Sequence, residues 1–245
     1  MSSKVRRSVI VIGASGGIGS ELCRRLVARG TEVTLLGRNE LALRQLGDEL
    51  DASYQTLDAS SFEDVEAALQ AVGSVDGVVN CAGSLLLKPA HLTSSEEWQA
   101  TVSTNLTTAF ATVRAASQLM RDRGGSIVLV SSAAARTGMP NHEAIAAAKA
   151  GVIGLARSAA ATYARRNIRV NVVAPGLTRT PLTKRVWSND RSAAASASIH
   201  ALGRLGEPSD VASMIAWLLE EENSWITGQV MGVDGGLATL RPYSS

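Results

Sequence analysis

The chain has 245 residues, 45% of them hydrophobic and 19% charged, with a formal net charge of +2. These values are typical of one globular domain with a substantial core, and so small a charge does not favour binding to nucleic acid or to an anionic membrane surface. Two cysteines do not predict a disulfide framework, and no run of 18 consecutive apolar residues predicts a membrane span. With no visible signal peptide, we expect a cytoplasmic protein.

The first motif along the chain is a glycine-rich turn between a predicted strand, residues 8–12, and a predicted helix, residues 20–29. The turn reads GASGGIG and contains Gly13, Gly17 and Gly19. Glycines let the backbone turn tightly and let a pyrophosphate approach the free N–H groups at the start of a helix. Strand, glycine turn and helix in this order predict a dinucleotide-binding unit.

The end of the second predicted strand, residues 32–36, bears on which dinucleotide is bound. An acidic residue there would bind the ribose hydroxyls and favour NAD. The chain instead has Gly37 followed by Arg38, whose guanidinium can pair with a 2′-phosphate through two hydrogen bonds. We therefore expect NADP(H) to be preferred over NAD(H), although a solvent-exposed arginine after a strand is the alternative interpretation.

The rest of the chain continues the alternation of strands and helices. Further strands are predicted at residues 54–57, 76–79, 127–130, 168–173 and 229–233, and further helices at 39–50, 61–72, 95–123, 143–165 and from 206 onward. This order predicts an α/β fold, a doubly wound parallel Rossmann-type sheet of seven strands, in a single domain covering residues 1–245. We expect residues 181–203, rich in Ala and Ser, to form a substrate lid.

The stretch from Gly125 to Gly151 joins a strand to an alanine-rich helix and contains Ser132 and Lys149. It resembles the catalytic segment of the short-chain dehydrogenase/reductase family, of the 3-oxoacyl-ACP reductase type, in which a serine precedes a Tyr-x-x-x-Lys motif. Residues 80–83, Asn-Cys-Ala-Gly, are similar to that family's Asn-Asn-Ala-Gly signature. With the glycine turn, the Pro-Gly turn at 175–176 and the C-terminal block, the resemblance spans about residues 8 to 238.

The resemblance implies roles for the matched residues. Ser132 would steady the substrate oxygen, Lys149 would donate to the ribose hydroxyls, and Asn105 would bend its helix and hold a water connected to the lysine. Asp58 would accept from the adenine amino group, and Thr178 or Thr180 would hold the carboxamide. The implied cofactor-binding residues are Gly13, Ser15, Gly17, Ile18, Gly19, Arg38, Asp58, Asn80, Ala82, Gly83, Lys149, Pro175, Gly176, Thr178 and Thr180. No metal is implied, and Gly16 takes the place of a second basic residue found in many relatives.

One position departs from the motif. Four residues before Lys149, where the family has its tyrosine, the chain has Ile145. A carbonyl that receives hydride from a nicotinamide needs a proton as its oxygen becomes an alkoxide, and a phenol beside a cation can supply that proton. Isoleucine has no proton to give, so the cofactor half of the motif is retained and the acid half is not.

Three interpretations follow from Ile145. In the first, which we favour, the protein is an NADP(H)-dependent oxidoreductase acting on a carbonyl or alcohol, or on an imine or enone, with another proton source. That source is His142, three residues upstream, or a water held by Lys149 and Ser132; His142 also fits a loop residue at a helix start. In the second, the protein binds a dinucleotide without catalysis, as a sensor or partner subunit, although Ser132, Lys149 and Asn105 argue against this. In the third, isoleucine was engineered into an ordinary enzyme.

Two further expectations concern the helix at 143–165 and the cysteine at position 81. Small residues on the helix, among them Ala147, Ala150 and Gly154, would let it approach a second copy closely, so we expect a homo-oligomer, a homotetramer as in relatives. Cys81 is expected to be a buried thiol rather than a nucleophile, because no histidine is adjacent in sequence to activate it.

Overall fold

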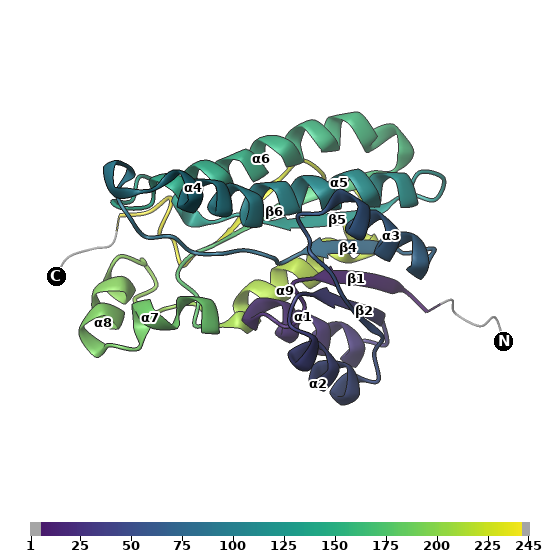
Figure 1. The fold of residues 1–245 in the computed structure, drawn as a ribbon, viewed down its shortest axis with the longest axis horizontal. Coiled ribbons are helices and arrows are strands. Elements are labelled where there is room, and N and C mark those ends of the chain that lie inside the picture. The colour runs from purple at the N-terminus through teal and green to yellow at the C-terminus, as the bar shows by residue number, and fades with distance from the viewer. Residues whose placement is uncertain (1–5, 242–245) are drawn as a thin grey trace.

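A single parallel sheet forms the centre of the protein (Figure 1). The structure is a computed structural model that describes residues 6–241, so residues 1–5 and 242–245 of the predicted domain lie outside the described residues. Within that range the strand order is β3-β2-β1-β4-β5-β6-β7, every neighbouring pair being parallel. The strands are β1 (Ser8–Ile12), β2 (Glu32–Gly37), β3 (Tyr54–Thr56), β4 (Gly77–Asn80), β5 (Gly125–Val130), β6 (Ile168–Pro175) and β7 (Val230–Val233).

Helices cover both faces of the sheet (Figure 1). They are α1 (Gly17–Ala28), α2 (Glu40–Leu50), α3 (Phe62–Val72), α4 (Ser95–Val102), α5 (Thr108–Leu119), α6 (Glu143–Tyr163), α7 (Lys184–Trp187), α8 (Asp190–Ser198) and α9 (Pro208–Leu219). Helices α3, α5 and α6 pack on one face, and α1, α2 and α9 on the other. The prediction of a seven-stranded, doubly wound sheet is therefore confirmed.

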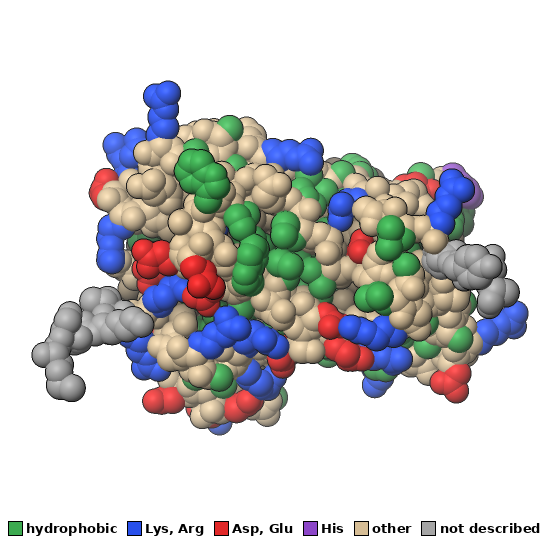
Figure 2. Space-filling model, turned by 180° about the vertical axis from the view of Figure 1, so that it is seen from behind, with side chains coloured by type: hydrophobic (Ala, Val, Ile, Leu, Met, Phe, Trp, Pro, Cys, Tyr) green, Lys and Arg blue, Asp and Glu red, His purple; other side chains and the backbone are tan. Residues whose placement is uncertain are grey.

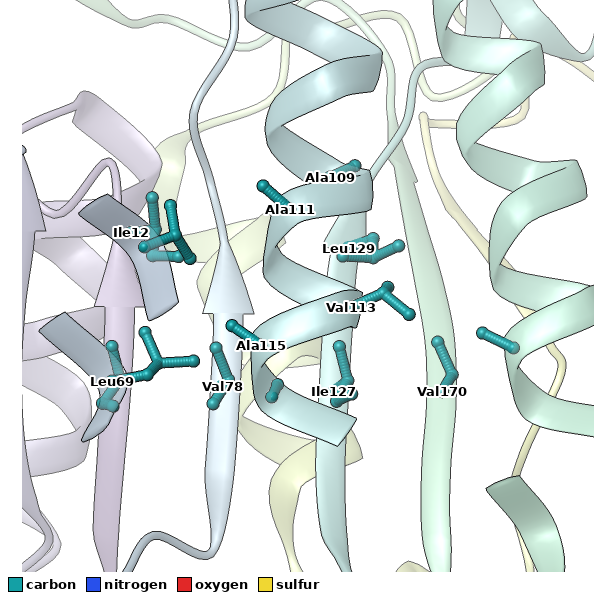
Figure 3. Close-up of a cluster of buried hydrophobic side chains, with 14 of the residues drawn as sticks. Ile12, Leu69, Val78, Ala109, Ala111, Val113, Ala115, Ile127, Leu129 and Val170 are labelled. Carbon is teal, nitrogen blue, oxygen red and sulfur yellow. The ribbon is translucent and has the colours of Figure 1, made fainter. Parts of the chain in front are cut away.

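The inner strands are apolar on both faces because helices cover both of them. Ile10 and Ile12 of β1 face the α3–α5–α6 layer, whereas Val9 and Val11 face the α1–α2–α9 layer. Figure 3 shows alanines of α5 lying over side chains of β4 and β5. Such small residues let the helix approach the sheet closely, and the resulting core holds the carboxyl ends of the strands in fixed positions.

Several boundaries differ from those expected. Helix α1 begins at Gly17, inside the glycine turn, and β6 continues to Pro175 because Ala174 and Pro175 still pair with β7. The helix expected at 95–123 ends at Leu119 and is divided between α4 and α5 by a π-helical turn, Ser103–Thr107. Such π-helical segments are rare and occur mostly as single turns inside α-helices.

Helix α6 with its following turn, Glu143–Arg166, is by length and composition able to cross a membrane, with a mean hydropathy of 1.3 over 18 residues. The sequence has no uninterrupted apolar run of that length because Lys149 and Arg157 lie within it. In the structure α6 packs along β6 and α5, with Ala148, Val152 and Ala156 buried. The same composition therefore suits a core helix of an α/β sheet.

Candidate active site

Most of the predicted site residues lie at the carboxyl ends of six strands. The turn after β1 carries Gly13, Arg38 follows β2, Asp58 follows β3, residues 80–83 close β4, Ser132 follows β5, and residues 175–180 end and follow β6. All strands are parallel, so these ends meet at one edge of the sheet. In doubly wound sheets the crevice at this edge, between β1 and β4 where the strand order reverses, is the usual place for a ligand.

One cavity at this edge, about 440 Å³ in volume, collects the adenosine half of the predicted cofactor site. Predicted residues on its wall are Gly13, Ser15, Arg38, Asp58, Ala82 and Gly83. Gly13 has φ +78°, and a Cβ there would lie 2.6 Å from the backbone nitrogen of Ala82. Only glycine can therefore bring the first turn this close to the turn after β4.

The charged groups of this cavity are Arg38 and Asp58. Asp58 Oδ1 accepts hydrogen bonds from the backbone N–H and the hydroxyl of Ser60, at 2.9 and 2.8 Å. These two bonds, with a smaller contribution from Arg38, lower the pKa of the Asp58 carboxyl, so it remains ionised at neutral pH. Arg38 is exposed on the wall that also carries Ser15, so its guanidinium and the serine hydroxyl are both available to an anion.

Asn80 does not line this cavity. Its side chain is buried, Nδ2 donates to Thr112 Oγ1 at 2.9 Å, and Oδ1 accepts from the Ala82 N–H at 2.8 Å. It thus shapes the turn at 81–83. Burial raises the pKa of the neighbouring Cys81 thiol to about 12, which leaves it protonated and a poor nucleophile at neutral pH.

Asn105 and Lys149 approach each other at Gly83, in the turn after β4. Asn105 lies in the π turn, where Nδ2 donates to the Thr101 carbonyl and to Ser84 Oγ, each at 2.9 Å, and Oδ1 accepts from the Ser84 N–H. A Cβ on Gly83 would lie 3.1 Å from Asn105 Oδ1 and 3.5 Å from Lys149 Nζ, so the three residues converge. Asn105 therefore lies in the π-helical turn that separates α4 from α5.

Lys149 is almost completely buried, with 6% of its surface exposed. Its ammonium group donates to the Val130 carbonyl at 2.8 Å, and none of the acidic side chains in residues 6–241 forms an ion pair with it. Burial lowers the pKa of Lys149 from 10.5 to about 8. Ser131 links the end of β5 to the backbone of α6, because its hydroxyl donates to the Lys149 carbonyl at 2.8 Å.

A second cavity, about 190 Å³ in volume, collects the predicted reaction centre. Ser132, His142 and Ile145 lie on its wall together with Pro175 and Gly176. Apolar side chains make up most of the remainder: Leu85, Leu87, Met139, Leu177, Val186, Ile199 and Leu237. Within the described part of the chain, no Lys, Arg, Asp or Glu lines this cavity.

The polar atoms that face this cavity are few. Ser132 Oγ accepts from the Ala134 N–H at 3.2 Å, and its own hydrogen remains available to a ligand. His142 is the residue before α6, and its Nδ1 lies 2.7 Å from the Pro140 carbonyl, so Nδ1 carries a hydrogen and Nε2 is left for other partners. Ile145 is 3% exposed and lies on the same wall.

The segment predicted as a lid, residues 181–203, supplies Thr183, Val186, Ser196, Ile199 and His200 to this wall. It is mostly helical, and Figure 1 shows α7 and α8 standing apart from the sheet. Arg185 Nη2 donates to the Leu85 carbonyl at 2.8 Å, which links α7 to the segment after β4. The sequence pattern of the lid gave no sign of this link.

The loop after β6 contains a contact that the sequence did not suggest. A Cβ on Gly176 would lie 2.7 Å from His200 Nε2 and 3.0 Å from the Cα of Asp234, so the glycine is needed for the approach of an imidazole. Gly17 lies against Thr180, with 2.9 Å between its Cβ position and Thr180 Cβ, so the first turn and this loop are in contact. Residues predicted to bind cofactor that line neither cavity are Gly17, Ile18, Gly19, Asn80, Lys149, Thr178 and Thr180.

Comparison with known proteins identifies the family of this chain. The family described as Enoyl-(Acyl carrier protein) reductase matches residues 13–238. The 3-oxoacyl-(acyl-carrier-protein) reductase FabG of Salmonella typhimurium is 37% identical over 235 residues, which cover 93% of this chain and 96% of that protein.

Solved structures agree with this. A short-chain type dehydrogenase/reductase from Mycobacterium ulcerans superposes with a TM-score of 0.92 at 33% identity, over 96% of this chain and 91% of that one. A single-residue variant of actinorhodin polyketide ketoreductase with NADPH has a TM-score of 0.89 at 31% identity, over 98% and 100% of the two chains. The chain belongs to the short-chain dehydrogenase/reductase family of oxidoreductases.

Proposed function

We propose that the protein is an NADP(H)-dependent oxidoreductase that acts on a small, uncharged carbonyl compound or alcohol, or on an imine or enone, with a proton source other than tyrosine. The observation that carries this proposal is the pairing of the two cavities. Glycines, Arg38 and Asp58 line the first, which supports binding of a phosphorylated dinucleotide, and Ser132 and Ile145 line the second, where we propose that the reaction takes place.

The residues of the first cavity fit this cofactor. Gly13 lets the first turn lie directly against the backbone of Ala82, and Arg38 beside Ser15 offers a cation and a hydroxyl to a 2′-phosphate. Asp58, ionised at neutral pH, can accept from the adenine amino group. Lys149 would hold the ribose, and Thr178 and Thr180 the carboxamide. When bound, the nicotinamide supplies or accepts the hydride.

His142 is our candidate proton donor. Its Nδ1–H is already held by the Pro140 carbonyl, which fixes the ring, and the opposite nitrogen is left to act on a ligand. In the imidazolium form, Nε2–H would donate a proton to the substrate oxygen and Nδ1–H would stay on Pro140. Ser132 would steady the same oxygen through its free hydrogen. A water held by Lys149 and Ser132 is the second route for the proton.

The cavity favours compact substrates that carry no anionic group. A carboxylate or phosphate would lose its hydration there without gaining a cation, since no Lys or Arg of the described residues lines the wall. Conjugated enones and iminium ions suit the wall at Ile145, because hydride addition gives a delocalised enolate or a neutral amine. Neither product needs the strong proton donor that an alkoxide needs.

Association into a homotetramer is part of the proposal. Ala147 and Ala150 of α6 are exposed, and nothing lies within 4 Å of the Cβ position of Gly154. Phe110 of the neighbouring α5 is 47% exposed. Figure 2, the view from behind Figure 1, shows acidic and basic side chains mixed around a strip of apolar ones. Light scattering that shows a monomer at micromolar concentration would remove this part.

A non-catalytic dinucleotide-binding protein, acting as a sensor or partner subunit, is the alternative, and the apolar wall at Ile145 is the observation in its favour. Calorimetric titration with NADPH and NADH, followed by NADPH oxidation with a panel of small ketones, enones and cyclic imines, separates the two. We expect tight NADPH binding and turnover with the enones or imines. Binding without turnover, even in Ile145→Tyr, supports the alternative, and no binding of either dinucleotide refutes both.

The histidine is tested in the same assay. If His142 is the donor, His142→Ala slows ketone reduction by roughly 10²-fold or more, while NADPH binding is unchanged. His91 is a matched control, because it lies in a different segment and lines neither cavity. Equal rates for His142→Ala and His91→Ala would assign the proton to water.

A further inference from the structure

His200 lies in the lid segment, just after α8, and none of the roles above uses it. Its side chain is buried, with 2% exposed, although the segment around it is largely exposed. A buried imidazole needs partners for both ring nitrogens, and each nitrogen here has one. Nδ1 lies 2.6 Å from the Ser196 carbonyl, and Nε2 accepts from the Leu177 N–H at 3.2 Å.

We propose that His200 is a positioning residue that fixes the loop at 175–177 to the lid, so that the nicotinamide-binding loop and the substrate cavity are set by one imidazole. This inference rests on the proposed function for its consequence in cofactor binding, but the link itself is a property of the chain alone. The loop supplies Pro175, Gly176 and Leu177 to the wall of the substrate cavity, and the lid supplies Ser196 and Ile199.

The geometry determines which nitrogen carries the hydrogen. Ser196 offers a carbonyl, so Nδ1 must be the donor, and Leu177 offers an N–H, so Nε2 must be bare. His200 is therefore the neutral Nδ1–H tautomer. The backbone of Leu177 is held from both sides, because its carbonyl accepts from the Gly206 N–H at 2.9 Å. Without the imidazole, the Leu177 N–H loses its acceptor and one of the two restraints on the loop is gone.

The surroundings of His200 show that its position is closely packed. Gly176 and Gly235 both face it: their Cβ positions would lie 2.7 Å from Nε2 and 3.4 Å from the Cβ of His200. Leu202, two residues on, donates its N–H to the Gly235 carbonyl at 3.0 Å. Three segments distant in sequence, at 175–177, 196–202 and 235, therefore meet at one ring, and a movement of the lid would be transmitted to the loop.

Two substitutions separate the two hydrogen bonds of the ring. In His200→Gln the carboxamide can reach the place of Nε2 and accept from Leu177, whereas the bond to Ser196 is lost. In His200→Asn the shorter side chain can donate to Ser196, whereas the Leu177 N–H has no acceptor. If His200 only filled space, the shorter Asn would leave a larger cavity than Gln. The two variants would then differ in melting temperature but not in their hydrogen bonding to Leu177.

The experiment compares these two variants in the absence and in the presence of NADPH. Without nucleotide, amide hydrogen exchange of the peptide containing Leu177 should stay slow in His200→Gln and become faster in His200→Asn. With nucleotide, the Kd for NADPH should be near the wild-type value for Gln and about 10-fold higher for Asn, the scale expected when one buried N–H is left without an acceptor. Equal exchange and equal Kd in the two variants would overturn the proposal.

A third measurement keeps His200 in place, so no substitution at position 200 has to fold. The chain contains three histidines, and His91→Ala and His142→Ala assign two of the three rings in a ¹⁵N-histidine spectrum. The remaining ring, His200, should show the neutral Nδ1–H tautomer in the absence of nucleotide. An Nε2–H tautomer for that ring refutes the link. If the wild type binds no dinucleotide, the proposed function fails, while the exchange and tautomer results still decide the role of His200.

Discussion

Replacing Ile145 by tyrosine tests most directly whether a general acid limits the rate of reduction at this site. In Ile145→Tyr the new hydroxyl would stand on the same helix face as Lys149, four residues away, and on the wall that carries Ser132. The 190 Å³ cavity beside Ile145 gives the ring a place to enter. Lys149, already buried, would lie near the phenol, and its positive charge would lower the pKa of that phenol.

The size of the effect follows from general acid catalysis. A well-placed acid contributes about 10²- to 10⁴-fold, which is about 3–5 kcal/mol of barrier. We therefore expect kcat/KM of Ile145→Tyr for small ketones to rise by this factor, measured as NADPH oxidation at saturating NADPH. The increase in kcat/KM for enones or imines should be much smaller. Ile145→Phe is the matched control, since it fills the cavity equally without a hydroxyl. If the Tyr and Phe variants reduce ketones at the same rate, the proposed reason for the departure at position 145 is wrong.

Three further changes test the cofactor site, the buried lysine and the assembly. Arg38→Ala should raise the Kd for NADPH about 10- to 100-fold, because one charge-assisted hydrogen-bond pair is lost, and should leave the Kd for NADH unchanged. Arg44→Ala is the control, since Arg44 is an exposed arginine on α2. An equal loss of affinity for NADPH and NADH in Arg38→Ala would contradict a 2′-phosphate contact. Lys149→Met should raise the free energy of unfolding at pH 7 by up to about 3 kcal/mol, because burial lowers the lysine pKa from 10.5 to about 8. Between those two pH values the unfolded chain binds more protons than the native one, so wild-type stability should rise with pH there and the Met variant should not; denaturant titrations at pH 7, 8 and 10 decide this. Gly154→Arg places a long charged side chain on α6 where no other atom lies within 4 Å, and it should shift the assembly to smaller species in light scattering. An unchanged mass would mean that the interface does not include this part of α6.

The fold was largely accessible from the sequence because its signals are local. A strand that runs into GASGGIG and then into a helix leaves few alternatives, and each later strand repeats the pattern. Ser132 and Arg38 come just after strands β5 and β2, and each lines one of the two cavities. Their position therefore depends mainly on the order of the strands, whereas that of Lys149 depends on how α6 packs.

What the sequence did not indicate depends on contacts between distant segments. His200 bonds to backbone groups, one of them 23 positions away at Leu177, and no side-chain pattern records an interaction with a backbone N–H. Gly176 was expected to bind cofactor, whereas the nearest atom to its Cβ position is the His200 ring nitrogen. Asn80 likewise matched a cofactor motif, while its polar atoms bond Thr112 and Ala82.

The cost of keeping Lys149 bears on the choice between catalysis and simple binding. A buried ammonium with its pKa lowered by about two units opposes folding at neutral pH, and an apolar side chain would remove that cost. Ser132 does not contribute to binding of the adenosine, since it lines the substrate cavity together with Ile145. A protein that only binds a dinucleotide could use Lys149 to hold the ribose, but it has no physical need for a serine hydroxyl beside Ile145. The presence of Ser132 in the substrate cavity therefore favours hydride transfer over simple binding.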